Sequence, residues 1–308
     1  MSAPTTTPPA TGGAPARPPA TARGAAPTRR RRGRGRTAAL SVLALVVALA
    51  WVFPVYWMWS SSLLPNSRLQ SFTPTFFPTG GSLENYQAVL GRGNFVQALT
   101  MSLTITLLSV VVCLLFAFLA ALAISRYRFR GRTSFVLAVL IIQMLPAEGL
   151  FIAQYKLMQG IGGLESVWGT SILYVAAVVP FTVWMLRGFV SAIPADLEEA
   201  AMVDGLSRPR AFFRITFPLL APGLVASGVY AFLQCWNEFT IALVILQREE
   251  NRTLPLWLRS FVQASVTREI DWGQVMAASS LVAVPVIVFF LLVQNRMTSG
   301  LVSGAVKG

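Results

Sequence analysis

The sequence predicts an all-α integral membrane protein with six transmembrane helices and both termini in the cytoplasm. Hydrophobic residues make up 55% of its 308 positions and charged residues only 12%, whereas a soluble domain carries roughly 25% charged residues. A helix needs about 20 residues to cross a bilayer, and six apolar runs reach this length. Basic residues gather on one side of these runs. The composition therefore identifies a multi-pass membrane protein.

The first 36 residues precede the apolar runs and are rich in Pro, Ala, Thr and Gly, ending in RRRRGRGR. Such a segment cannot bury a core, so residues 1–36 are expected to be a disordered basic tail. A secretory signal is not favoured, because the basic region is too long and the next apolar run is long enough to span. The arginines are expected to hold the tail in the cytoplasm beside anionic lipid rather than to bind nucleic acid.

Residues 37–308 are expected to form one transmembrane domain. The predicted spans lie near 38–60, 98–124, 134–155, 168–190, 219–246 and 275–294. With the N-terminus inside, 18 of the 25 Lys and Arg residues fall on the inner side and 7 on the outer side. Because basic residues favour the cytoplasmic side of a membrane, this bias supports the predicted orientation.

The segment 193–218 is a polar island between the fourth and fifth spans and is predicted to be a cytoplasmic helical hairpin. Asp196, Glu198 and Glu199 place negative charge in a first helical turn, where the helix dipole favours it. Gly205 suits a left-handed helix stop. Ser207 can begin a second short helix that has Pro209 in its first turn.

Polar residues interrupt several of the apolar runs. Gln143 and Glu148 flank Pro146 in the third run, and Gln234, Trp236, Asn237 and Glu238 cluster in the fifth. An ionisable residue inside a span is costly and is by default a candidate functional residue, although it can also pair across a helix interface. We expect Gln143, Glu148, Gln234, Trp236, Asn237 and Glu238 to line a substrate path, with Trp236 able to stack on a ligand.

Several enzymatic classes are excluded by missing motifs. There is no GxxxxGK[ST] phosphate loop, so ATP is not bound by that mechanism. The chain has no His, which removes HExxH metal sites and the usual catalytic triads. We expect no catalytic residue, metal or cofactor in this chain. A transport subunit that takes its energy from a partner fits these exclusions.

The hairpin carries a resemblance to a known family. Glu199, Ala200, Ala201, Gly205, Ile215 and Pro218 match the EAA–G–I–LP signature of permease subunits of binding-protein-dependent ABC importers. Phe217 departs from the Leu of that signature. The likeness extends over residues 38–308 and is to the MalG-like subunit of carbohydrate importers. Four further runs carry it: LENYQAVL, VVPFTVWMLRGFVSAIPADLEEAAMVDG, LQCWNEFTIAL and GLVSGAVKG.

The resemblance implies a type I ABC importer permease fold in a bacterial plasma membrane. It implies as partners a second permease, two copies of a cytoplasmic ATPase that binds ATP and Mg, and an extracytoplasmic sugar-binding protein. It also implies that the hairpin docks on the ATPase. The residues expected to take part in this coupling are Glu198, Glu199, Ala200, Ala201, Asp204, Gly205, Arg208, Arg210, Ile215 and Pro218.

The expected substrate is a sugar or oligosaccharide, and two alternatives stay open. An importer for a polyamine would need several carboxylates along its path, and only Glu148 and Glu238 are available. A standalone secondary transporter would show internal repeats and paired half-helices, and would leave the hairpin unexplained.

Overall fold

The computed structural model describes residues 34–92, 94–263 and 269–305, and the side chains of most of these. The predicted tail 1–36 therefore lies almost wholly outside the described residues. By internal packing the chain forms two units, residues 1–51 and 52–308. Helix α1 (Arg34–Ser62) begins in the first unit and ends in the second.

The described residues are helical and contain no strand. Short helices lie in the connections between the long ones: α2 (Asn66–Leu69), α3 (Glu84–Gly91), α11 (Thr240–Ile245), η3 (Glu249–Asn251) and α12 (Leu254–Val262). The remaining elements of the second unit are α4 (Phe95–Arg126), α5 (Arg132–Ile142), η1 (Ala147–Leu150), α6 (Phe151–Gly160), α7 (Val167–Ala192), α8 (Asp196–Val203), α9 (Arg208–Ala211), η2 (Phe212–Thr216), α10 (Phe217–Trp236) and α13 (Trp272–Ala305).

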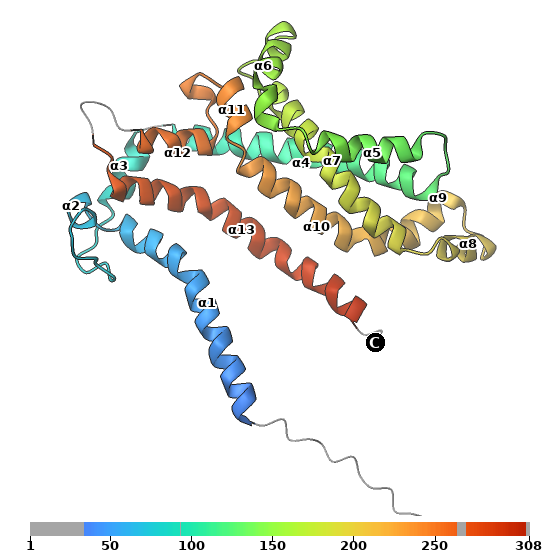
Figure 1. Cartoon of the computed structure of the whole chain (residues 1–308), viewed down its shortest axis with the longest axis horizontal. Coiled ribbons are helices and arrows are strands. Elements are labelled where there is room, and N and C mark those ends of the chain that lie inside the picture. The colour runs from blue at the N-terminus through green and yellow to red at the C-terminus, as the bar shows by residue number, and fades with distance from the viewer. Residues whose placement is uncertain (1–33, 93, 264–268, 306–308) are drawn as a thin grey trace, which may run out of the picture. The chain divides into compact units, whose positions relative to one another are not determined.

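The centre of the second unit is a layer of long helices in which α4 packs on α7 and α10 packs on both (Figure 1). Helix α13 also packs on α10. The buried face of α4 follows helical spacing and consists mostly of small side chains, among them Ser109, Cys113, Ala117 and Ala121. Because lipid tails are as apolar as Leu, membrane helices associate by such close packing of small residues.

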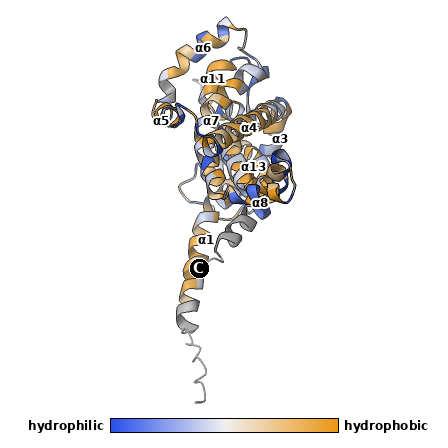
Figure 2. Cartoon of the chain, turned by 90° about the vertical axis from the view of Figure 1, so that its right-hand side faces the viewer, coloured by the Kyte–Doolittle hydropathy of each residue, from blue (hydrophilic) through white to orange (hydrophobic). Residues whose placement is uncertain are grey.

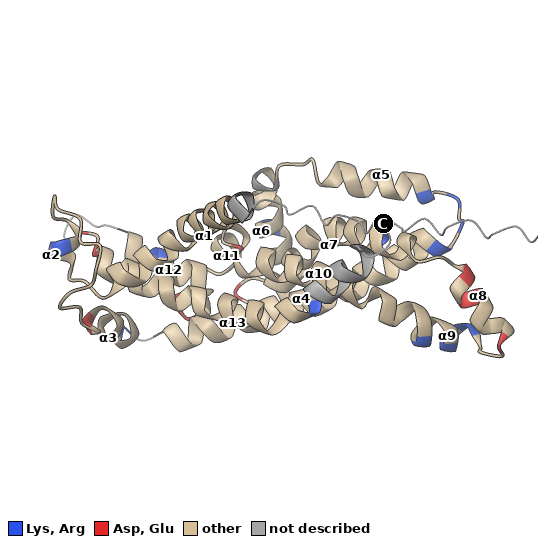
Figure 3. Cartoon of the chain, turned by 90° about the horizontal axis from the view of Figure 1, so that it is seen from below, with Lys and Arg blue, Asp and Glu red and all other residues tan. Residues whose placement is uncertain are grey.

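Charged side chains gather at the ends of this layer, on α2, α3, α8, α9 and the turn before α5, and few lie along its middle (Figure 3). Apolar residues dominate the long helices (Figure 2), while α8 combines three carboxylates in its first turn with apolar residues. Five described helical segments are long and apolar enough to cross a membrane: Ala38–Ser62, Phe95–Arg126, Val167–Ala192, Arg208–Trp236 and Trp272–Arg296. An all-helical membrane fold is therefore confirmed.

The predicted third span, 134–155, is not one continuous helix. Helix α5 ends at Ile142, a turn follows, and the chain resumes as η1 and α6. Pro146 lacks an N–H and disfavours helix in the residue before it, which explains the break. The 11 residues of α5 span about 16 Å at 1.5 Å each, which is about half of a hydrocarbon core. The predicted third span, the total of six spans and the side on which the termini lie therefore stay predictions.

The predicted fifth span, 219–246, also differs. Its helix is continuous from Arg208 and ends at Trp236, and only the short α11 follows. The cluster from Gln234 to Glu238 thus lies at a helix end rather than inside a helix.

Candidate functional site: the polar hairpin and the intramembrane polar residues

The hairpin 193–218 is formed as two short helices joined at a glycine. Helix α8 begins at Asp196 with three carboxylates in its first turn. Gly205 has φ +92°, and Leu206 N–H donates to the Ala201 carbonyl at 3.1 Å while Gly205 N–H donates to Met202 at 3.0 Å. These two bonds make the Schellman motif that left-handed glycine permits. Ser207 and Pro209 then begin α9 as predicted.

Helix α9 continues without a break into the fifth span. Residues Phe212–Thr216 form a π-helical turn, η2, and α10 follows directly at Phe217. Helix α9, η2 and α10 therefore form one continuous helical segment from Arg208 to Trp236. A π-turn widens the helix by one residue per turn and is frequent at functional sites.

Glu198 holds the hairpin against two other elements. Its Oε1 lies 3.4 Å from Nη2 of Arg126, the last residue of α4, and accepts a hydrogen bond of 2.6 Å from Thr216 Oγ1 in η2. The Arg126 and Glu198 side chains are 17% and 18% exposed. A partly buried pair is screened less by salt than a surface pair, so this contact fixes α8 relative to both helices.

Glu198 and Ala201 thus face inward, although we expected both in the docking surface. Ala201 is 4% exposed and belongs to the packing between α8 and the following helix. Its small side chain permits close approach within the hairpin rather than to another protein. Ile215 is half-buried. The other predicted coupling residues are exposed: Glu199, Ala200, Asp204, Gly205, Arg208, Arg210 and Pro218.

A cavity of about 400 Å³ opens beside this exposed face. Its walls come from the end of α4, from α8 and from the α9–η2 corner. Arg126 Nε is buried there without a hydrogen-bond partner among the described atoms. The lining residues that carry charge are Arg126, Glu198, Glu199 and Arg208.

The intramembrane polar residues divide into an exposed group and a buried group. Gln143, Gln234 and Asn237 are exposed. Gln234 Nε2 donates to Tyr230 Oη at 3.1 Å, and Asn237 Nδ2 donates to the Leu233 carbonyl at 2.8 Å. Glu148 lies in η1, and its side chain is outside the described residues.

Trp236 and Glu238 have structural contacts instead. Trp236 is 1% exposed and stacks on Phe232 with 14° between the ring planes. That position does not offer its ring to a ligand. The Glu238 carboxylate accepts hydrogen bonds from the backbone N–H of Ile241 at 2.8 Å and Ala242 at 3.1 Å. It therefore caps the first turn of α11, where a carboxylate is stabilised by free N–H groups.

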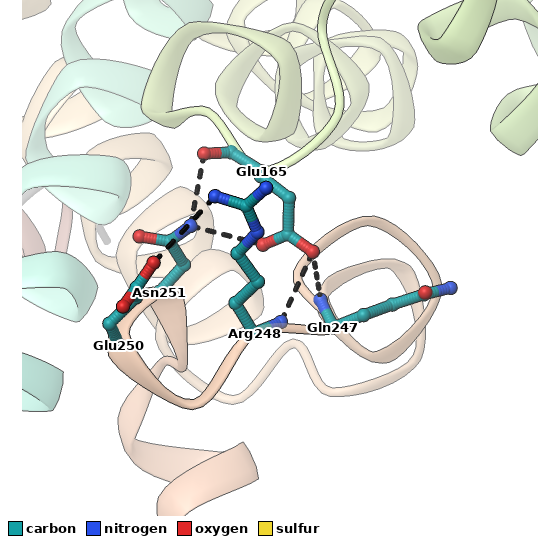
Figure 4. Close-up of polar contacts among 5 residues, drawn as sticks. All are labelled: Glu165, Gln247, Arg248, Glu250 and Asn251. Carbon is teal, nitrogen blue, oxygen red and sulfur yellow. Dashed lines mark hydrogen bonds and ion pairs between the residues drawn. The ribbon is translucent and has the colours of Figure 1, made fainter.

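Two residues with organising roles were missed by the sequence reasoning. Arg126 was counted only as an orientation signal. Glu165, which has φ +53°, accepts hydrogen bonds through Oε1 from the backbone N–H of Gln247 at 2.8 Å and Arg248 at 3.1 Å (Figure 4). Its Oε2 accepts from Asn251 Nδ2 at 3.1 Å. This clamp ties the corner before α7 to the loop after α11, and no local sequence signal announces it.

Comparison with known proteins is consistent with this architecture. The profile of the family described as binding-protein-dependent transport system inner membrane component matches residues 88–299. The diacetylchitobiose uptake system permease protein DasC of Streptomyces coelicolor is 40% identical over 268 residues, covering 87% of this chain and 96% of the relative. The trehalose/maltose permease MalG of Thermococcus litoralis is 34% identical over 276 residues, covering 87% and 96%.

The trehalose transport system permease protein SugB of Mycobacterium tuberculosis is 33% identical over 264 residues, covering 86% of this chain and 95% of the relative. Among solved structures, a bacterial ABC transporter involved in the import of the acidic polysaccharide alginate has a chain with a TM-score of 0.70 and 25% identity. That match covers 88% of this chain and 99% of the other.

Proposed function

Because the chain belongs to the family of binding-protein-dependent transport system inner membrane components and is a multi-pass ABC importer permease of a bacterial plasma membrane, we propose that its substrate is a sugar or oligosaccharide. The observation that carries this proposal is the 40% identity, over 87% of the chain, to a diacetylchitobiose permease. Relatives named for trehalose and maltose support the same substrate class.

The proposed complex contains partners of the kinds that an ABC importer requires. This chain pairs with a second, different permease and with two copies of a cytoplasmic ATPase, which binds ATP and Mg. An extracytoplasmic binding protein delivers the sugar. The chain itself is non-catalytic in this proposal, and its part is to form one side of the path and to receive motion from the ATPase.

The hairpin is the proposed coupling element. Its exposed face offers Glu199 together with Arg208 and Arg210, for which no ion pair is seen among the described residues. Charged groups of this kind provide complementarity and register at a protein interface. Inside the hairpin, Glu198 binds Arg126 of α4 and Thr216 of η2. ATPase closure that displaces α8 therefore moves α4 and α10 with it, and differential binding of nucleotide to the two arrangements drives the change.

Reconstitution tests this function. The chain, its second permease and the ATPase are placed in proteoliposomes with the binding protein that copurifies with them. Uptake of diacetylchitobiose, trehalose and maltose is compared with uptake of putrescine. ATP-dependent uptake of a sugar is expected. Uptake of putrescine without any sugar would establish the polyamine alternative, and uptake that persists without the ATPase would establish a standalone transporter.

A further inference from the structure

We propose that Gln143, Phe181, Trp184, Tyr230 and Gln234 form the surface on which this subunit holds the sugar as it crosses the membrane. We call these five residues the aromatic–amide surface. The inference rests on the proposed sugar substrate and assigns it a place. It adds three aromatic residues that the sequence did not assign to the substrate path, and it replaces Trp236 and Glu238, whose side chains serve internal contacts.

The three aromatic rings and one amide form a continuous series across two helices. The ring centroid of Phe181 lies 5.9 Å from that of Trp184 on α7 and 4.5 Å from that of Tyr230 on α10. Gln234 lies one turn beyond Tyr230 and donates to its hydroxyl at 3.1 Å. The series thus runs from the aromatic rings of α7 to an exposed amide at the end of α10.

Gln143, which directly follows α5, lies beside two of these rings, Phe181 and Trp184. A cavity of about 190 Å³ lies between the end of α5 and the middle of α7. Gln143, Phe181 and Trp184 line it together with Val139, Leu140 and Pro180. The two glutamines therefore flank one aromatic patch, although they lie far apart in the sequence.

The patch lies near the middle of the predicted fourth span, 168–190. Phe181 follows Pro180 in the middle of the 26-residue helix α7, and its contact with Tyr230 places that ring at the same level. Transport proteins commonly hold their substrates near the bilayer midplane. None of the five residues is charged, which suits a neutral sugar.

Contact with lipid does not explain this surface. Gln234 is exposed in this chain and Trp184 is 50% exposed. An exposed amide whose hydrogen bonds are only partly satisfied is costly to place in hydrocarbon. Polar side chains in spans accordingly face a protein interior or a water-filled cavity. By contrast, α4 presents an exposed face of Val111, Leu115 and Leu119, which is purely apolar.

The residue types fit a sugar. Aromatic rings pack on the apolar C–H face of a pyranose ring, while a glutamine amide offers both donors and an acceptor to hydroxyl groups. Ligand sites typically combine apolar and aromatic walls with a few placed polar groups. Contact with a few rings and amides is weak enough to release the sugar, as transport requires.

Thiol accessibility tests whether the surface faces water. Cys113 and Cys235 are both buried, so a single introduced cysteine reports on its own position in this chain. In the assembled importer, Gln234→Cys is expected to react with a water-soluble thiol reagent, and diacetylchitobiose with its binding protein and ATP is expected to slow that reaction. Leu115→Cys, on the apolar face of α4, is expected to stay unlabelled. Absence of labelling at Gln234→Cys with and without ATP would overturn the proposal.

Uptake kinetics test whether the surface binds sugar. Trp184→Ala is expected to lower uptake about three- to tenfold, because the ring contact with the sugar is lost, and to change the ratio of diacetylchitobiose to trehalose uptake. ATP hydrolysis stimulated by the loaded binding protein is expected to persist. Leu115→Ala serves as the control. An unchanged rate and ratio in Trp184→Ala would overturn the proposal and leave the sugar-importer function intact, whereas a wild-type importer that carries no sugar would overturn both.

Discussion

The guanidinium of Arg126 lies 3.4 Å from the carboxylate of Glu198, so that one ion pair joins the last turn of α4 to the first turn of α8. Thr216 donates to the same carboxylate oxygen. One side chain therefore connects the exposed hairpin to both helices that continue into the membrane. The Glu198 side chain thus holds the hairpin to α4 and to η2.

Glu198→Gln is expected to uncouple the importer. The amide oxygen can still accept from Thr216, but the attraction to Arg126 is lost and a partly buried guanidinium is left unpaired, which is destabilising. Sugar uptake should fall more than ATP hydrolysis does. The two rates are measured together in proteoliposomes.

Glu199→Gln is the matched control for that experiment. Glu199 is exposed on the same turn, and no bond of its side chain is seen within the described residues. The Glu199→Gln substitution is expected to weaken association with the ATPase without lowering the thermal stability of the chain. Equal ratios of uptake to hydrolysis in both variants would show that the Glu198 contact does not transmit motion.

Gly205→Val is expected to abolish most uptake while the amount of chain in the membrane stays near normal. A residue with a Cβ pays about 1–2 kcal/mol at a left-handed φ, and the Schellman turn that sets the bend between α8 and α9 would open. Gly205→Asn should retain more activity, because Asn tolerates this conformation. Uptake and membrane abundance are measured in parallel.

Gly131 supplies the comparison, since its φ is +91° and a Cβ there would meet nothing within 4 Å, as at Gly205. Gly131→Val introduces the same backbone strain on the same side of the predicted topology, outside the hairpin. If it impairs uptake as severely as Gly205→Val, strain alone and not the hairpin bend explains the loss.

Gly223→Ala is expected to destabilise the packing of α10 on α7. A Cβ at Gly223 would lie 2.5 Å from Phe189 Cγ and 2.8 Å from its Cβ, so the helices must shift, at a cost of about 1–3 kcal/mol. The thermal midpoint of the solubilised importer should fall. Gly228→Ala on the same helix meets only Leu114 Cδ1 at 3.4 Å and should leave the midpoint almost unchanged; equal midpoints for the two variants would contradict the close approach at Gly223.

Glu165→Ala is expected to loosen the loop after α11. The carboxylate accepts two backbone N–H groups and the Asn251 amide, and its loss leaves these donors unpaired. Amide hydrogen exchange at Gln247 and Arg248 should accelerate at least tenfold, which corresponds to about 1.4 kcal/mol of local opening. Glu250→Ala removes only the exposed 3.7 Å pair with Arg248 and should change exchange little. Unchanged protection in Glu165→Ala would mean that the clamp does not hold the loop.

Much of the fold could be read from local patterns. Apolar runs predicted the long helices, and Gly205 and Ser207 predicted where α8 ends and α9 begins. The break near Pro146 was visible as an interruption, yet the sequence did not show that the interruption splits the helix. Whether a proline bends or breaks a helix depends on what its freed carbonyl groups and its neighbours contact.

In the candidate site, the sequence predicted the exposed residues better than the buried ones. Exposed members of the coupling set, such as Glu199 and Arg208, lie where the hairpin motif places them. Glu198, the residue before Glu199, instead contacts Arg126 and Thr216, and Ala201 is buried. The polar cluster of the fifth run likewise separated into exposed Gln234 and Asn237 and inward-facing Trp236 and Glu238. Adjacent residues of a helix point in different directions, so a cluster in sequence is not a cluster in space.

The sequence by itself determined the membrane class, the long apolar helices, the hairpin and its glycine turn, because hydropathy and backbone preference act over a few neighbouring residues. Only the tertiary structure decided that Arg126 binds Glu198, that Glu165 clamps a loop more than 80 positions away, and that Phe181 of α7 touches Tyr230 of α10. Those contacts arise from the close packing of separate helices, which fixes which face of each helix meets its neighbour.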